Sequence, residues 1–302
     1  MDNKIIIGVD LGGTKIMAGA IDNEGKVLGS PVKVPTGGND TADLIVRRIT
    51  NSVEKILSSL NLRIQDVEGI GIGSTGPLDI DEGLILECPQ LPGMHFFPLR
   101  KTIQDYFAVP VFLNNDANCL IYGEAVFGSA ADKNNVAGFT LGTGIGCALI
   151  LNKKIINGST GTAAEIWISP YRSGIIEDFV SGAGVSKIYK SISGIDKTSL
   201  EVYNLALEGD SHALQTWGEF GTHLAVPIAW VINLIDPEAV ILGGSITSAY
   251  PFFKNSMEER LRKWICPVPA ERTKVILAKL GDNAGFIGAA CLVIENRKYK
   301  EI

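Results

Sequence analysis

The chain has 302 residues, of which 46% are hydrophobic and 20% charged, as in a globular protein with one large domain or two ordinary ones. Its net charge of −6, without a stripe of Lys and Arg, argues against a nucleic-acid partner. No apolar run approaches the ~20 residues of a membrane span, and the sequence opens on the strand-like IIIGVD instead of a signal peptide. We therefore expect a cytoplasmic enzyme without a membrane partner.

The cysteines give no sign of a metal site or of disulfide bonds. There are five of them, and none belongs to a CxxC or CxC pair. Zinc sites and disulfide-rich domains show such regular spacings. We therefore expect reduced thiols, and neither a disulfide framework nor a zinc knot.

In chain order, the first half of the sequence predicts three strands followed by two pairs of helix and strand. β-Branched runs at 5–9, 15–21 and 26–34, joined by the turns LGGT and NEG, indicate an antiparallel meander. Apolar residues in the region 41–60 recur at helical spacing. The other elements expected in this half are a strand at 67–73, a helix at 99–107 and a strand at 109–113.

The second half predicts a similar unit. It opens with a strand at 136–141, the glycine turn GTGIG at 142–146 and a strand at 147–151. The elements expected after it are helices at about 175–190, 199–208, 211–234 and 249–264, strands at 239–242 and 275–280, and a last helix from about residue 283. Pro227 should interrupt or kink the third of these helices. Two similar α/β halves with a cleft between them are the simplest architecture, with a linker near 117–135.

The sequence VPVFLNNDAN places a carboxylate directly after a strand. The apolar run Val109–Leu113 stops at Asn114, and helix-forming sequence begins after Asp116. Ligands of α/β proteins meet the carboxyl ends of strands, where Asp116 is placed to take a proton from a hydroxyl that Asn115 holds. The alternative is that Asp116 only caps the following helix, a role that Asp performs well.

Two glycine-rich turns between strands suit phosphate binding, because glycine lets backbone N–H groups approach phosphate oxygens without a Cβ in the way. In DLGGTK, Asp10 suits Mg²⁺ or its waters, while the Thr14 hydroxyl and the Lys15 ammonium suit phosphate. Either turn alone is as typical of an ordinary hairpin. Together with Gly243-Gly244, a possible nucleoside shelf after a third strand, they favour a split nucleotide site.

Two rival nucleotide motifs do not hold. GIGSTG at 71–76 fits GxGxxG, but Pro77 and the acidic residues after it continue as a turn where that motif must open a helix. A Walker loop, GxxxxGK[ST], does not occur in the sequence. The backbone at Thr75 and Gly76 is instead expected to border a small polar ligand.

The motifs DLGGTK, STGPLD, NDAN, LGTGIG and the C-terminal LGG and GAA occur in this order. In this combination the chain resembles the ROK family of sugar kinases, from about residue 4 to 295. The resemblance implies an α/β protein with the two-domain, actin-like (ribonuclease H-like) ATPase fold and an interdomain cleft. We expect an N-terminal domain at 1–117, a C-terminal domain at 118–283, and a final helix at about 284–302 that packs back on the first domain.

The resemblance implies glucokinase-like phosphorylation of a hexose or related sugar by ATP, with Mg²⁺ as cofactor. Asp116 matches the catalytic base. Residues expected to contact the sugar are Thr75, Gly76, Asn115, Asp116, Glu165 and Glu177. Residues expected to contact ATP or its metal are Asp10, Gly12, Gly13, Thr14, Lys15, Gly142, Thr143, Gly144, Gly243 and Gly244. A homodimer or homotetramer is expected.

The chain departs from the family in the wall that reads the sugar. Where the family has EIGH, this sequence has Glu165 followed by Ile166, Trp167 and Ile168, and the family's cysteine-rich zinc segment is missing. The resemblance therefore predicts no zinc site, and glucose cannot be assumed as the substrate. Trp167 either stacks on a larger or less polar sugar or packs where the zinc loop stood in other members.

The mechanism expected is in-line transfer of the γ-phosphoryl group to a primary hydroxyl, most often the 6-OH, with Asp116 as the base. The first alternative is a kinase of an N-acetylhexosamine, a fructose-like sugar or a glycoside. A sugar-sensing repressor is the second, and the absence of a helix-turn-helix before the first strand argues against it. A sugar-binding protein without catalysis is the third.

Overall fold

The chain divides into two compact units in the computed structural model, which describes residues 4–297. The first unit contains the chain up to Asp132, the segment Ile150–Ala163 and the chain from Ala278 on. The second contains Lys133–Leu149 and Ala164–Leu277. Each has a mixed α/β composition and a separate hydrophobic core.

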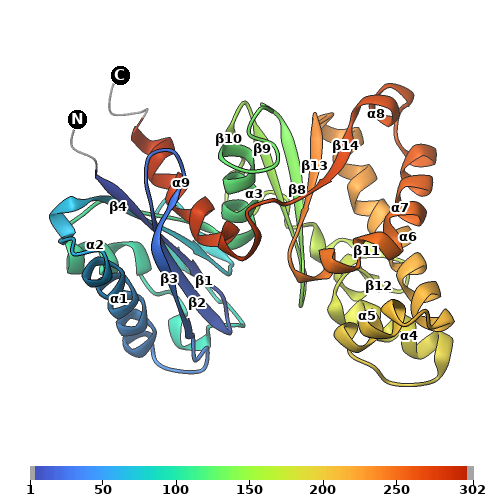
Figure 1. Ribbon diagram of the computed structural model, residues 1–302, viewed down its shortest axis with the longest axis horizontal. Helices are drawn as coiled ribbons and strands as arrows, with labels where there is room; N and C mark the ends of the chain where they lie inside the picture. The colour runs from blue at the N-terminus through green and yellow to red at the C-terminus, as the bar shows by residue number, and fades with distance from the viewer. Residues whose placement is uncertain (1–3, 298–302) are drawn as a thin grey trace. The chain divides into compact units, whose positions relative to one another are not determined.

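The first sheet has the strand order β3-β2-β1-β4-β7, and Figure 1 labels its strands β1 to β4. Strands β1 (Ile5–Leu11), β2 (Lys15–Ile21) and β3 (Val27–Pro35) pair antiparallel, which confirms the predicted meander. β4 (Val67–Ser74) runs parallel to β1, and β7 (Val111–Asn115) runs parallel to β4. The carboxyl ends of β1, β4 and β7 therefore meet at one edge of the sheet.

Helix α1 (Ala42–Ser59) packs on strands β2 and β3. Ile45, Ile49, Val53 and Ile56 are buried and recur at the helical period, so this stripe faces the sheet. The shorter helix α2 (Leu99–Phe107) packs beside β7 through Leu99, Ile103 and Phe107. Both helices were predicted, the first from its apolar spacing.

Helix α9 (Ala284–Arg297) returns to the first sheet, where it contacts β1, β4 and helix α3 (Asp116–Val126) (Figure 1). The contact depends on glycines in the strands. A Cβ on Gly8 would lie 1.8 Å from the carbonyl oxygen of Phe286, and one on Gly71 would lie 1.7 Å from that of Ala289. The backbones of sheet and helix thus approach more closely than any side chain allows.

The second sheet has the strand order β10-β9-β8-β13-β14 (Figure 1). β9 (Ile145–Leu151) and β10 (Lys154–Ile155) pair antiparallel. β8 (Val136–Leu141), β13 (Ala239–Gly243) and β14 (Lys274–Leu277) run parallel. As in the first sheet, an antiparallel hairpin with a glycine turn is followed by parallel strands, which is the repetition that the sequence indicated.

The helices of the second unit are α4 (Gly182–Ser193), α5 (Ser199–Leu207), α6 (Ser211–Ile235), α7 (Tyr250–Trp264) and α8 (Pro267–Arg272). Among the described residues, α6 alone is long and apolar enough to pass for a membrane span, and 56% of its most apolar window is buried inside the protein. Trp217, Phe220 and Leu224 place it in the core, so we describe it as a core helix. The expected interruption at Pro227 does not occur, since the helix continues through this residue.

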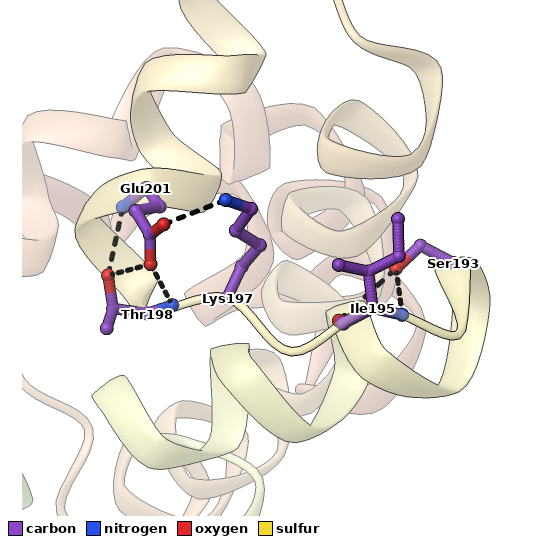
Figure 2. A network of polar contacts seen from close by, with 5 residues as sticks. All are labelled: Ser193, Ile195, Lys197, Thr198 and Glu201. Atoms are coloured by element: carbon purple, nitrogen blue, oxygen red, sulfur yellow. Dashed lines mark hydrogen bonds and ion pairs between the residues drawn. The ribbon is translucent and has the colours of Figure 1, made fainter.

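A capping box fixes the start of α5 (Figure 2). The Glu201 carboxylate accepts the N–H and the hydroxyl of Thr198, both at 2.9 Å, while the Thr198 hydroxyl oxygen accepts the Glu201 N–H at 3.3 Å. Lys197 donates to the same carboxylate at 2.9 Å and, as the main cause, lowers the pKa of Glu201 to about 2. Before this capping box, α4 ends at Gly194, which adopts a left-handed conformation with a φ of +76°.

Some predicted boundaries were wrong. The helix expected at 175–190 begins only at Gly182, because the Ser181 side chain caps it there. The short elements of this stretch are the hairpin β11 (Pro170–Tyr171) and β12 (Gly174–Ile175), followed by a 3-10 turn at Ile176–Asp178. β14 ends at Leu277, three residues earlier than expected.

Candidate functional site

Three of the predicted site segments leave neighbouring strands at one edge of the first sheet. Asp10 of β1 is in register with Gly73 of β4, which is in register with Asn114 of β7. The turn DLGGTK follows β1, the turn STGP follows β4, and Asp116 follows β7. These residues thus gather at the carboxyl ends of parallel strands, where α/β proteins bind their ligands.

Asn115 caps helix α3, and Asp116 is the first residue of that helix. The Asn115 Oδ1 accepts the N–H groups of Ala117 and Asn118 at 2.9 and 3.3 Å. Asn115 therefore holds the N-cap position, and the Asp116 Oδ1 also accepts the Ala117 N–H, at 2.7 Å. The Asn115 Nδ2 faces the STGP turn, 3.5 Å from the place where a Cβ on Gly76 would stand. This amide nitrogen and the Asp116 carboxylate are thus positioned at the same strand end.

Asp10 lies in an environment that disfavours its charge. Burial, followed by the negative charge of Asp116, raises the pKa of Asp10 to about 7, although the Lys15 ammonium acts in the opposite direction. The carboxyl group packs on Gly285 of α9, where a Cβ would lie 2.7 Å from the Asp10 Cγ. A divalent cation would relieve this electrostatic cost, and carboxylate oxygens are the ligands that Mg²⁺ prefers. The surroundings of Asp10 are therefore compatible with a divalent cation.

The turn DLGGTK is held by a residue that the sequence did not single out. The Gly12 N–H donates to the Lys15 carbonyl at 3.0 Å and closes the turn. Buried Thr36 donates its hydroxyl to the Gly12 carbonyl at 2.6 Å and its N–H to the Thr14 carbonyl at 3.0 Å. Arg48 of α1 donates to the Thr36 carbonyl at 2.6 Å. No local pattern marks Thr36, because its partners in the turn lie more than 20 positions earlier in the chain.

The turn STGP borders the same sheet edge. The Thr75 N–H donates to the Leu11 carbonyl at 3.1 Å, which ties this turn to the end of β1. The peptide bond between Gly76 and Pro77 is cis, and the chain continues into the short strand β5 (Leu78–Asp79). A helix does not follow GIGSTG, so the rejection of the dinucleotide motif is confirmed.

The second glycine turn joins β8 to β9. Its Gly142 N–H donates to the Gly144 carbonyl at 3.0 Å, and the Gly142 carbonyl accepts the N–H of Gly182, at the start of α4, at 2.8 Å. Thr143 is exposed at the tip of the turn. The start of a helix thus lies beside this turn, as is common at phosphate sites.

Gly243 and Gly244 follow the neighbouring strand. Gly243 ends β13 in register with Thr140 of β8. Gly244 has a φ of +90°, and a Cβ there would lie 2.3 Å from the Leu141 carbonyl oxygen, so glycine is required on both grounds. Its exposed backbone lies at the carboxyl end of β13, which runs parallel to β8.

The two predicted sugar-binding glutamates lie in the second unit near β9. Glu177 accepts the N–H of Ile145 at 3.1 Å, and a Cβ on Gly144 would lie 2.2 Å from its carboxylate, so Glu177 packs against the glycine turn. The Trp167 indole N–H donates to the exposed carboxylate of Glu165. Trp167 also packs on the core of this unit, which favours the packing role over an exposed stacking surface.

The position of the family's ligand histidine is occupied by an exposed side chain. Ile168 is 58% exposed. The hairpin β11–β12 follows it, and the Tyr171 hydroxyl of this hairpin lies 3.0 Å from the His223 Nδ1 on α6. Within residues 4–297, no three His, Cys, Asp or Glu side chains are grouped so that they could hold a metal ion.

Comparison with known proteins identifies the family. Residues 6–296 match the ROK family. The whole chain is 27% identical to a glucokinase of Halalkalibacterium halodurans and covers 98% of that protein. It is 32% identical to an N-acetyl-D-glucosamine kinase of Vibrio atlanticus, over 95% of this chain and 99% of that one.

A solved structure supports the same assignment at the level of the fold. The ROK family glucokinase from Streptomyces griseus, in complex with glucose and AMPPNP, is 29% identical and aligns with a TM-score of 0.81 over 96% of this chain and 99% of its own. The fold is therefore the actin-like, two-domain fold of these kinases, as the motifs predicted. By its fold, by its motifs and by a match that spans nearly its whole length, the chain belongs to the ROK family.

Proposed function

We propose that this chain transfers the γ-phosphoryl group of ATP to a hydroxyl of a hexose, with the 6-OH as the preferred acceptor. It is a carbohydrate kinase, as its glucokinase and N-acetyl-D-glucosamine kinase relatives support. The observation that carries the proposal is the pair of carboxylates at one sheet edge. Asp10 and Asp116 influence each other electrostatically there, beside a glycine turn.

Asp116 is the proposed general base. It accepts the proton of the sugar hydroxyl as that oxygen attacks the γ-phosphorus, so the nucleophile does not carry a positive charge. The Asn115 Nδ2 donates to a sugar hydroxyl, and the backbone at Thr75 and Gly76 borders the ring. The position of Asn115 Nδ2 beside Gly76 supports this division of roles.

Two further proposed sugar ligands are Glu165 and Glu177. Carboxylates accept hydrogen bonds from vicinal hydroxyl groups, and the Glu165 carboxylate is exposed. The contact between Glu177 and the Ile145 N–H holds that carboxylate next to the second glycine turn. This contact connects a proposed sugar ligand, Glu177, to the turn that is proposed to bind phosphate.

The proposed nucleotide ligands belong to both units. Gly12, Gly13, Thr14 and Lys15 bind phosphate oxygens from the first glycine turn, and Gly142, Thr143 and Gly144 do so from the second. Gly243 and Gly244 support the nucleoside. Residues 1–117 therefore supply the base and the first phosphate loop, and residues 118–283 supply the second loop and the nucleoside shelf.

Asp10 is the proposed ligand of Mg²⁺ or of its waters. When bound, the ion neutralises charge on the phosphate oxygens during transfer. The raised pKa of Asp10 supports this role, because a carboxylate beside Asp116 gains from a nearby cation. No zinc is proposed.

The sugar is proposed to be glucose or a close relative of it. The relatives include kinases of glucose and of N-acetyl-D-glucosamine, and the side chains Trp167 and Ile168 alter the wall that would separate these substrates. An N-acetylhexosamine, fructose or a glycoside is therefore the second candidate. A non-catalytic sugar-binding protein is the third.

A panel of these sugars with ATP and Mg²⁺, read as ADP release, tests the proposal. We expect one hexose to stimulate turnover, and we expect Asp116→Asn to lower kcat by roughly 100-fold or more while sugar binding, measured by calorimetry, changes little. Turnover near the wild-type rate in Asp116→Asn would refute the base. ADP release that none of the sugars raises above background would favour the non-catalytic candidate.

We further propose a soluble homodimer or homotetramer in the cytoplasm, where ATP is available. Exposed apolar side chains on the second unit support self-association: Trp230 and Leu234 of α6, Trp264 of α7 and Val268 of α8. The Asn233 side chain bonds the backbone of Trp264 and Cys266, so these segments lie together. Light scattering measures the oligomeric state, and a monomer at micromolar concentration would contradict this proposal.

A further inference from the structure

Three asparagine side chains form a buried chain of hydrogen bonds next to Asp116. The Asn114 Oδ1 accepts the Asn118 Nδ2 at 2.9 Å and also accepts the backbone N–H of Asn115 at 2.8 Å. The Asn114 Nδ2 donates to the Asn157 Oδ1 at 3.0 Å. Asn114 and Asn118 are 4% and 3% exposed, so water does not compete for these groups.

The third member of this chain comes from a distant segment. Asn157 lies 43 residues after Asn114. Its segment is fixed in two places: the Ala163 N–H donates to the Asn157 carbonyl at 3.1 Å, and Gly161 packs so closely that a Cβ there would lie 3.0 Å from the Leu78 carbonyl oxygen. The Asn157 carboxamide is therefore presented to Asn114 by an anchored loop that also contacts the chain after the STGP turn.

The backbone N–H of Asn115 sets which way the Asn114 carboxamide points, and the Asn157 acceptor satisfies the NH₂ group in that orientation. If that carboxamide turned over, its NH₂ group would face two donors, the N–H of Asn115 and the Nδ2 of Asn118, and its oxygen would face the oxygen of Asn157. Both contacts would be repulsive, and buried polar groups would lose their partners. One orientation is thus selected by the whole set.

We propose that Asn157 is a positioning residue for Asp116, acting through Asn114. The inference rests on the proposed role of Asp116 as the base. Asn114 holds the N–H of Asn115, so it fixes the peptide that leads from β7 into α3 and hence the direction of the first carboxylate of the helix. A base must lie within hydrogen-bond reach of the acceptor hydroxyl, and a shift of about 1 Å costs up to 100-fold in rate.

Asn157→Ala removes the acceptor, and Asn157→Asp keeps it. We expect Asn157→Ala to lower kcat by roughly 10- to 100-fold, with the KM values for sugar and ATP within about 2-fold of wild type. Asn157→Asp should restore most of kcat, because its Oδ1 still accepts from Asn114. If Asn157→Ala does not fold, Asn157→Leu fills a similar volume without an acceptor and takes its place.

Asn233→Ala is the matched control. The Asn233 carboxamide also bonds a segment distant in sequence, the backbone of Trp264 and Cys266, at 2.8 and 3.1 Å, but it lies in the second unit on the exposed end of α6. We expect it to lower thermal stability without changing kcat. A kcat for Asn157→Ala equal to that of Asn233→Ala, or an Asn157→Asp variant as slow as Asn157→Ala, would overturn the inference.

A double variant separates this inference from the proposed function. In an Asp116→Asn background, Asn157→Ala should change the residual turnover by less than about 2-fold, because no base remains to be misplaced. A further loss as large as in the wild-type background would show a general structural defect and overturn the positioning role. Wild-type turnover in Asp116→Asn would instead show that Asp116 is not the base. That result would refute the proposed function and not only this inference.

Discussion

At the scale of single residues, Asp10 shows a conflict between function and stability. Its pKa is raised to about 7, first by burial and then by the charge of Asp116. The folded protein therefore binds this proton more tightly than the unfolded chain does. The contribution of Asp10 to stability is full at acidic pH, falls as the pH rises from about 4 to about 7, and is constant above that range.

Asp10→Asn should therefore stabilise the protein at alkaline pH. Without divalent cations, we expect a gain on the order of 2 to 4 kcal/mol in the free energy of unfolding at pH 8, and a much smaller gain at pH 4.5. Urea unfolding in the presence of a chelator measures both. Asp105→Asn, on the exposed face of α2, is the control and should show no such pH dependence. Equal gains for Asp10→Asn at the two pH values would contradict the prediction.

The same scale shows which residues of the candidate site a sequence can point to. Asp10, Asn115 and Asp116 were predicted because each stands at the end of a strand-like run, where the neighbouring letters are informative. Thr36 and Asn157 act through partners 24 and 43 positions away, so no local pattern contains both ends of the contact. Such residues become visible only when the fold brings the segments together.

At the scale of elements, most strands and helices could be predicted because their apolar period or β-branched runs are clear. The predicted boundaries were wrong where a side-chain cap sets the end of the element. β7 starts two residues later than expected and includes Asn114 and Asn115, since Asn115 both ends the strand and caps α3. The family resemblance led us to expect that the last helix packs back on the first domain, and α9 contacts β1 and β4. The closeness of that contact could not be predicted, because it depends on glycines whose partners belong to other elements.

Two helical glycines give a matched test of that packing. A Cβ on Gly288 of α9 would lie 1.7 Å from the Cys119 carbonyl oxygen of α3, whereas a Cβ on Gly218 of α6 would meet no atom within 4 Å. We expect Gly288→Ala to destabilise the protein by about 2 kcal/mol or more through overpacking. Gly218→Ala should stabilise it by about 0.5 to 1 kcal/mol through helix propensity. Thermal unfolding measures both, and effects of the same sign would show that the close contact relaxes easily.

At the scale of the whole molecule, the chain passes between the two units four times, and the first and last passages lie after Asp132 and before Ala278. Buried Glu124 of α3 holds residues near the first and the last of these passages. Its Oε2 accepts the Ser129 N–H at 2.7 Å, and its Oε1 accepts the N–H groups of Lys279 and Leu280 at 2.8 and 2.7 Å. One carboxylate thus anchors the outgoing and the returning segment within the first unit.

Glu124→Gln tests this anchor. Gln replaces one acceptor oxygen by a donor, so at least one buried N–H faces another donor, and we expect a loss of about 1 to 3 kcal/mol in unfolding free energy. Glu238→Gln is the control, because Glu238 also accepts two N–H groups, at 2.7 and 2.9 Å, but is exposed. Chemical denaturation compares the variants. A loss no larger than that of Glu238→Gln would show that Glu124 is not a special anchor.

The return of α9 to the first sheet has a consequence for biosynthesis. A ribosome translates β1 to β7 early, then the entire stretch Ala164–Leu277 of the other core, and α9 only afterwards. The glycine-lined face of the first sheet, at Gly8 and Gly71, therefore has no cover while the nascent chain grows. The second core can mature during translation, whereas the first must wait, and chaperones that shield apolar strands would be needed mainly in that interval.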